Sequence, residues 1–82
     1  MDIREVLARN LRIYRRERGL SQEELAHRAD IDRTYVSALE RCVYGASIDV
    51  VDKLATALNV EAADLLRKAP PARRQSATDD GV

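Results

Sequence analysis

The chain has 82 residues, a length that holds one small domain near the lower limit of what folds without disulfides or metals. Its hydrophobic fraction is 45%, and without Phe or Trp the core must be built from Leu, Ile, Val and Ala, which favours a small helix bundle. One cysteine and one histidine exclude an intramolecular disulfide and a metal cluster. No apolar run reaches the length of a membrane span and no signal peptide is visible, so we expect a cytoplasmic protein that does not contact membranes.

The formal net charge is zero, which by itself argues mildly against a nucleic-acid partner, because neutralised phosphates supply much of DNA affinity. The charges are unevenly spread, however. Residues 1–18 contain six Arg and three acidic residues, a net charge of +3, whereas residues 19–47 contain three Arg and five acidic residues, a net charge of −2. This weakly basic surface predicts salt-sensitive DNA binding. A single copy would bind poorly, and a dimer would double the basic surface.

Residues 2–18 are predicted to form the first helix. Ile3, Leu7, Leu11 and Tyr14 follow one another at spacings of four and three, which places them on one apolar face. Arginines lie mostly on the other side. Gly19 is predicted to end the helix, as glycine commonly does just past a helix C-terminus.

Residues 21–41 predict two short helices joined by a tight turn. Ser21 and Glu24 have the spacing of a capping box at a helix start. Asp32 is the predicted N-cap of the second helix, after a three-residue joint at 30–32. Helices joined so tightly cross at a steep angle and leave the second one protruding, where its short polar and cationic side chains fit a DNA major groove. The pattern predicts a helix-turn-helix.

Three motifs within residues 19–41 resemble the Cro/repressor-type (XRE) helix-turn-helix family: Gly19-Leu20-Ser21-Gln22-Glu23-Glu24-Leu25-Ala26, Tyr35-Val36-Ser37 and Leu39-Glu40-Arg41. The run Asp32-Arg33-Thr34-Tyr35-Val36-Ser37 is also similar to the controller proteins of restriction–modification systems. The resemblance covers roughly residues 5–68.

This resemblance implies an all-α, compact five-helix bundle of the phage-repressor DNA-binding type, whose second and third helices form the helix-turn-helix. It implies double-stranded DNA as the partner, and a homodimer formed through the C-terminal helices. It also implies that Arg15, near the end of the first helix, pairs with Glu40 at the end of the recognition helix.

The predicted recognition helix, about residues 33–42, carries most of the candidate DNA contacts. The predicted base contacts are Arg33, Thr34, Ser37 and Ala38. The predicted phosphate contacts are Gln22, Tyr35 and Arg41. These assignments follow from chemistry, because Arg binds guanine through two hydrogen bonds, methyl groups meet the thymine methyl, and polar groups at a helix start reach phosphates.

Alternatives stay open for three of these residues. Arg33 could bind a phosphate or form a salt bridge with Asp30. Gln22 could be a solvated polar residue at its helix start, and Arg41 could neutralise the C-terminal dipole of its helix.

The chain departs from the family pattern just after the recognition helix. Cys42 stands where the family usually has Gly and Ala46 where it usually has Pro, so we expect the loop to turn differently, by extending the helix. Val43 and Tyr44 would then form an apolar pair that faces either DNA or a partner chain. Asp30 occupies another position where the family usually has Gly, and Asp tolerates the left-handed backbone favoured there.

Residues 47–59 are predicted to form a fourth helix capped by Ser47, and residues 61–68 a short fifth helix. Residues 1–69 therefore make up the predicted DNA-binding domain with its dimerisation helix. Residues 70–82 begin with two prolines and show no apolar periodicity, so they are predicted to form a flexible tail.

Val60, Leu65 and Leu66 provide more apolar surface than so short a fifth helix needs to bury, so we predict that they form a dimer interface. The alternative is that all three complete the core of the monomer. A dimer suits the predicted function, because one helix-turn-helix reads too few base pairs to select a genomic site, whereas two can read a palindromic operator.

The sequence lacks the parts of an enzyme, since no nucleophile or metal cluster stands with a positioned base and no glycine-rich phosphate loop exists. We expect no cofactor and no small-molecule ligand. The predicted function is a sequence-specific transcriptional regulator that binds a palindromic operator as a homodimer. The alternative is an antitoxin-type or adaptor protein that uses the same fold to bind a protein partner, and the tail from Pro70 favours it.

Overall fold

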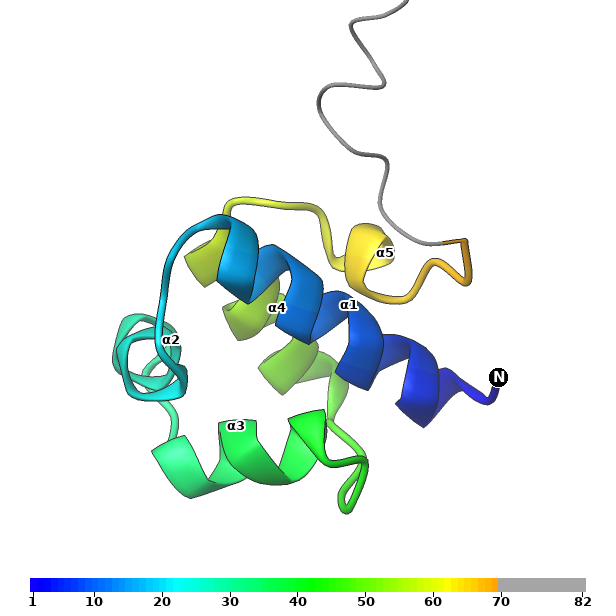
Figure 1. Cartoon of the computed structure of the whole chain (residues 1–82), viewed down its shortest axis with the longest axis horizontal. Coiled ribbons are helices and arrows are strands. Elements are labelled where there is room, and N and C mark those ends of the chain that lie inside the picture. Colours follow the sequence, from blue (N-terminus) through cyan, green and yellow to red (C-terminus); the bar gives the residue numbers. More distant parts are fainter. Residues whose placement is uncertain (70–82) are drawn as a thin grey trace, which may run out of the picture.

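The computed structural model describes residues 1–69, which contain five α-helices. They are α1 (Ile3–Glu17), α2 (Gln22–Ala29), α3 (Arg33–Glu40), α4 (Ile48–Leu58) and α5 (Ala62–Leu65). The predicted all-α bundle is confirmed. In Figure 1, α3 lies along one edge of the molecule and α5 along the opposite edge, with α1 and α4 between them.

The predicted tail at residues 70–82 lies outside the described residues. Within residues 1–69, no helix has both the length and the apolar character needed to cross a membrane. The fifth helix is shorter than predicted and spans four residues.

The helices begin at the side chains that the sequence marks as caps. The Ser21 hydroxyl accepts the Glu24 N–H at 3.0 Å while the Glu24 carboxylate accepts the Ser21 N–H at 2.8 Å, so the predicted capping box is confirmed. Asp32 caps α3 and Ser47 caps α4, each by accepting a backbone N–H of the first turn. Asp30 has a φ of +58°, so its predicted left-handed conformation is confirmed as well.

The turn after α3 contradicts the prediction that the loop extends this helix. α3 ends at Glu40, and Cys42 adopts a φ of +62°. In this conformation the Cys42 N–H donates to the Leu39 carbonyl at 3.1 Å and the Val43 N–H donates to the Ala38 carbonyl at 2.9 Å. This pair of bonds is a Schellman motif. Cys42 therefore makes the turn that Gly usually makes, although its Cβ makes the left-handed backbone costly.

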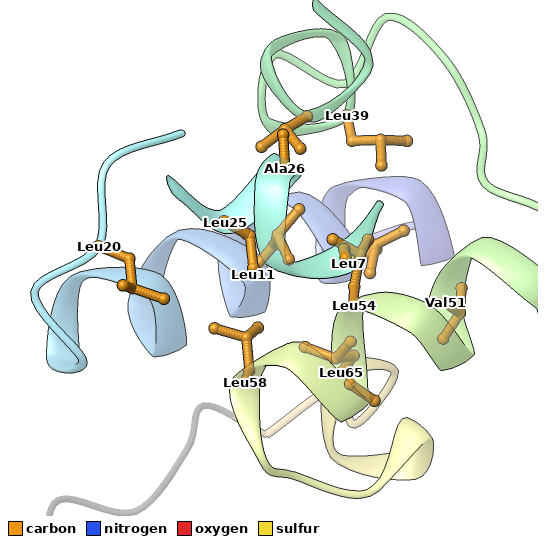
Figure 2. Close-up of a cluster of buried hydrophobic side chains, with 13 residues drawn as sticks. Leu7, Leu11, Leu20, Leu25, Ala26, Leu39, Val51, Leu54, Leu58 and Leu65 are labelled. Carbon is orange, nitrogen blue, oxygen red and sulfur yellow. The ribbon is translucent and has the colours of Figure 1, made fainter. Parts of the chain in front are cut away.

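The core is built from aliphatic side chains of all five helices. Figure 2 shows Leu7 and Leu11 of α1 close to Leu54 of α4, between Leu39 of α3 and Leu65 of α5. Leu11, Leu54 and Leu65 have no exposed surface. Burial of several such side chains, each worth about 1.5–3 kcal/mol, is the main source of stability.

Arg9 and Arg12 of α1, and Arg18 at its C-cap, donate hydrogen bonds within the fold. Arg12 donates to the carbonyl that ends α3 at 2.7 Å, Arg18 to the carbonyl that ends α4 at 2.6 Å, and Arg9 to two carbonyls after α5 at 3.1 and 2.6 Å. The last carbonyls of a helix lack partners within it and carry the negative end of its dipole. Arg12 and Arg18 therefore neutralise the C-terminal ends of α3 and α4, while Arg9 holds the segment that follows α5, so part of the hydrogen-bonding capacity of each is used within the fold.

Asn10 is a fully buried polar residue of α1 that the sequence reasoning missed. Its Nδ2 group donates to the carbonyls of Asp64, Leu65 and Arg67 at 3.3, 3.0 and 2.9 Å. A signal was present, because Asn10 comes three residues after Leu7 on the apolar face of the helix. This amide holds the short α5 against α1.

We expect Asn10→Leu to lower the free energy of unfolding by about 1–3 kcal/mol, because the volume of the side chain is kept while buried carbonyls lose their donor. Urea unfolding followed by circular dichroism measures this change. Arg16→Ala, at an exposed position of the same helix, is the control. An unfolding midpoint equal to that of the wild type would contradict the role assigned to Asn10.

Candidate nucleic-acid interface

α3 presents its polar side chains along one shallow groove of about 160 Å³, which we call the reading groove. It is lined by Gln22, Arg33, Thr34, Ser37 and Arg41. The structure thus brings together five of the seven predicted DNA contacts. Arg33, Thr34 and Arg41 are exposed, whereas Gln22 and Ser37 are half-buried.

Asp32 lies beside this groove and is engaged locally. Its carboxylate accepts the Thr34 N–H at 2.9 Å and the Thr34 hydroxyl at 2.8 Å. The backbone hydrogen bond, then the hydroxyl bond and the nearby charge of Arg33, hold the pKa of Asp32 below its ordinary value. The carboxylate therefore stays charged and stabilises the positive end of α3. The Thr34 methyl group and the hydroxyl lone pairs are what remain for a ligand.

Arg33 is the first residue of α3, and its guanidinium is exposed. The alternative of a salt bridge with Asp30 is not found among the ion pairs of residues 1–69. The guanidinium is therefore available to a ligand that approaches the N-terminal half of α3.

Glu40 is a buried carboxylate behind the reading groove, with 4% of its side chain exposed. Arg15 Nε donates to Glu40 Oε2 at 2.7 Å and Arg15 Nη2 donates to Glu40 Oε1 at 2.9 Å. The predicted ion pair is confirmed. The hydrogen bonds to Glu40 raise the pKa of Arg15, although burial opposes the charged form.

Gln22 is a third member of this cluster that the sequence reasoning missed. Its Nε2 group donates to Glu40 Oε1 at 3.0 Å. An amide nitrogen has two hydrogens, so one remains for the predicted phosphate contact. Glu40 therefore ties together α1, α2 and α3, and Gln22 connects this cluster to the reading groove.

The structure changes the interpretation of two predicted contacts. Ala38 is 4% exposed, so its methyl group is not free to meet a base, and that prediction is corrected. Tyr35 is half-buried and its hydroxyl donates to the Gly45 carbonyl at 3.4 Å. The predicted phosphate contact of Tyr35 would have to replace this bond.

Arg41 follows the last turn of α3 and is exposed. Its Nε donates to the Ser37 carbonyl at 3.4 Å, which is the dipole-neutralising arrangement that the sequence left open. The other N–H groups of the guanidinium still reach the edge of the reading groove. Both roles are therefore compatible with the position of Arg41.

Two short helices crossing at a left-handed joint, with a polar groove on the second, define a DNA-binding helix-turn-helix domain. A family model described as helix-turn-helix (HTH_3) matches residues 11–65. The chain belongs to this family, as the XRE-type resemblance of its motifs predicted.

Several known proteins are similar to the chain. A hypothetical transcription factor of Neisseria meningitidis is 48% identical over 73 residues, which cover 89% of this chain and 67% of that protein. The restriction–modification controller protein C.AhdI of Aeromonas hydrophila is 40% identical with a TM-score of 0.74, over 76% of this chain and 94% of that one. The biofilm master regulator SinR, solved in complex with DNA, is 32% identical with a TM-score of 0.72, over 74% of this chain and 98% of that one. The chain is a DNA-binding transcriptional regulator and not an enzyme.

We expect Glu40→Ala to lower the free energy of unfolding by about 3–5 kcal/mol, because it leaves the buried charge of Arg15 without a partner. Unfolding in guanidinium chloride, followed by tyrosine fluorescence, measures this change in the free energy of unfolding. Glu23→Ala, which removes an exposed carboxylate from α2, is the matched control. If both variants unfold at the same denaturant concentration, the cluster does not hold the domain together.

Proposed function

We propose that the protein is a sequence-specific regulator that binds a palindromic operator as a homodimer, with α3 in the major groove. The observation that carries this proposal is the reading groove, where exposed cationic and hydroxyl groups gather on the second helix of a helix-turn-helix. SinR, a relative with the same fold, has been solved in complex with DNA. That likeness supports DNA as the occupant of the groove.

The groups along α3 suit different tasks. Arg33 lies at the N-terminus of the helix, the part that reaches base edges in helix-turn-helix proteins, and a guanidinium there can bind both guanine acceptors. The Thr34 methyl and the Ser37 hydroxyl extend this base-reading surface. Gln22 and Arg41 lie at the margins of the groove, where they are placed to bind phosphates and set the register.

The charge distribution supports a dimer. Since Arg9, Arg12, Arg15 and Arg18 bind groups within the domain, few cations remain on the α3 face of one copy. A two-fold dimer doubles this footprint and places two recognition helices about 34 Å apart, one turn of DNA.

The structure also changes the predicted dimer interface. Leu65 has no exposed surface in the single chain, so it completes the monomer core, and its assignment to the interface is wrong. Leu66 is 37% exposed, whereas Val60 is half-buried against the core. Leu66 lines an apolar groove with Ile3 and Ile48, which are 51% and 86% exposed. We propose that this groove receives the second copy.

We expect Arg33→Ala to relax base preference at one position of each half-site and to cost about 1–3 kcal/mol on the preferred sequence. Selection of binding sites from random DNA with the purified wild type and variant measures this effect. Arg41→Ala is the matched control, because losing a phosphate contact weakens all sites alike and reduces the salt slope by about one. Equal site preferences for Arg33→Ala and the wild type would refute the base-reading role.

We expect the wild type to sediment as a dimer and Ile48→Asp as a monomer with weaker operator binding. Asp is favourable in the first turn of α4, so this variant keeps the fold while it places a charge in the apolar groove. His27→Asp adds the same charge to the exposed surface of α2 and should remain a dimer. A dimeric Ile48→Asp protein would show that the interface lies elsewhere.

A further inference from the structure

The loop between α3 and α4 exposes two large apolar side chains beside the recognition helix. Val43 is 57% exposed and Tyr44 is 60% exposed. Neither belongs to the core or to the apolar groove proposed for dimerisation. Adjacent exposed apolar residues next to a binding face indicate a surface that a partner covers.

This loop is held against α3 at several points. The Schellman bonds at Cys42 and Val43 fix where the chain leaves the helix. The ring of Tyr44 then packs edge-on against the ring of Tyr35, with centroids 6.4 Å apart and an interplanar angle of 77°. The Tyr35 hydroxyl donates to the carbonyl of Gly45 at 3.4 Å. Tyr44 is therefore placed by α3 and not by the loop alone.

The hollow in front of Tyr44 is continuous with the reading groove. Its lining includes Thr34, Ala38, Arg41, Val43 and Tyr44. Thr34 and Arg41 line the reading groove as well, so the two depressions meet along α3. In Figure 1 this loop lies along the same edge of the molecule as α3, away from α5. A ligand that fills the reading groove would therefore meet Thr34 and Arg41, which also border the hollow in front of Tyr44.

We propose that Val43 and Tyr44 form an uncharged second contact to the DNA backbone, beside the bases that α3 reads. The Val43 methyl groups and the Tyr44 ring pack against the apolar faces of deoxyribose, and the Tyr44 hydroxyl donates to a phosphate oxygen. Tyr35 is the positioning residue that holds Tyr44 in place. This inference rests on the proposed function, because it places the loop on the same DNA.

The chemistry of the patch favours DNA over a protein partner. Thr34 and Arg41, both exposed, line the hollow beside Val43 and Tyr44, so a hydroxyl and a guanidinium stand next to apolar side chains, which suits a backbone that alternates phosphate and sugar. A neutral contact adds affinity without releasing counterions. Such a contact compensates for the small number of free cations on this face.

The test measures binding of the wild type, Tyr44→Ala and Arg41→Ala to the selected operator at several salt concentrations. Tyr44→Ala should weaken binding roughly five- to tenfold, comparable to the loss of one specific contact, while the slope of log K against log salt stays unchanged. Arg41→Ala should weaken binding and reduce the slope by about one. The Tyr44→Ala loss should be equal on operator variants, since a sugar contact carries no sequence information.

The role of Tyr35 is tested by coupling. Tyr35→Phe keeps the ring contact and should bind almost as the wild type does. The double variant Tyr35→Ala/Tyr44→Ala should bind no more weakly than Tyr35→Ala alone, because Tyr35 acts through Tyr44. Additive losses would overturn the positioning role.

Other outcomes separate the two proposals. If the wild type binds its operator specifically and Tyr44→Ala binds equally well, the loop contact is wrong while the proposed function stands. If the wild type shows no salt-dependent, specific DNA binding, the proposed function fails. If Tyr44→Ala becomes monomeric in sedimentation but keeps wild-type affinity for a half-site, the patch covers a second copy instead of DNA, which overturns the inference.

Discussion

The structure depends on one buried carboxylate. Glu40 has lost most of its hydration, so it is tolerable only because Arg15 and Gln22 supply three hydrogen bonds to its two oxygens. These donors come from α1 and α2, and the acceptor comes from the end of α3. The cluster therefore fixes the orientation of α3 relative to α1 and α2, and the Gln22 side chain joins it to the reading groove.

A second consequence concerns charge. The chain has no net charge, and the positive surplus of residues 1–18 is partly used within the fold, because Arg12 and Arg18 bind the last carbonyls of α3 and α4 and Arg9 binds two carbonyls after α5. The same cations stabilise the fold by neutralising helix dipoles. In the proposed function, affinity comes from a few exposed cations, from the proposed pairing of two copies, and from the uncharged contact proposed for Tyr44.

The outcome at particular residues shows where sequence reasoning succeeds. Helix starts were predictable because a cap such as Ser21 or Asp32 bonds N–H groups two or three residues away, so the signal is local. The loop after α3 was not predictable, because a residue with a Cβ rarely adopts the left-handed backbone that Cys42 adopts in the Schellman turn at the end of α3. Ala38 and Leu65 were misassigned for a related reason. Which neighbours cover a side chain is decided by segments far away in the chain.

The sequence by itself determined the helical class, most helix boundaries, the helix-turn-helix and the set of polar residues that α3 carries. All of these follow from short-range periodicity and capping. Tertiary structure alone decided which arginines remain free, that Asn10 holds α5, and that the loop after α3 stands beside the reading groove. Those properties depend on hydrogen bonds and contacts between residues distant in sequence, which no local pattern encodes.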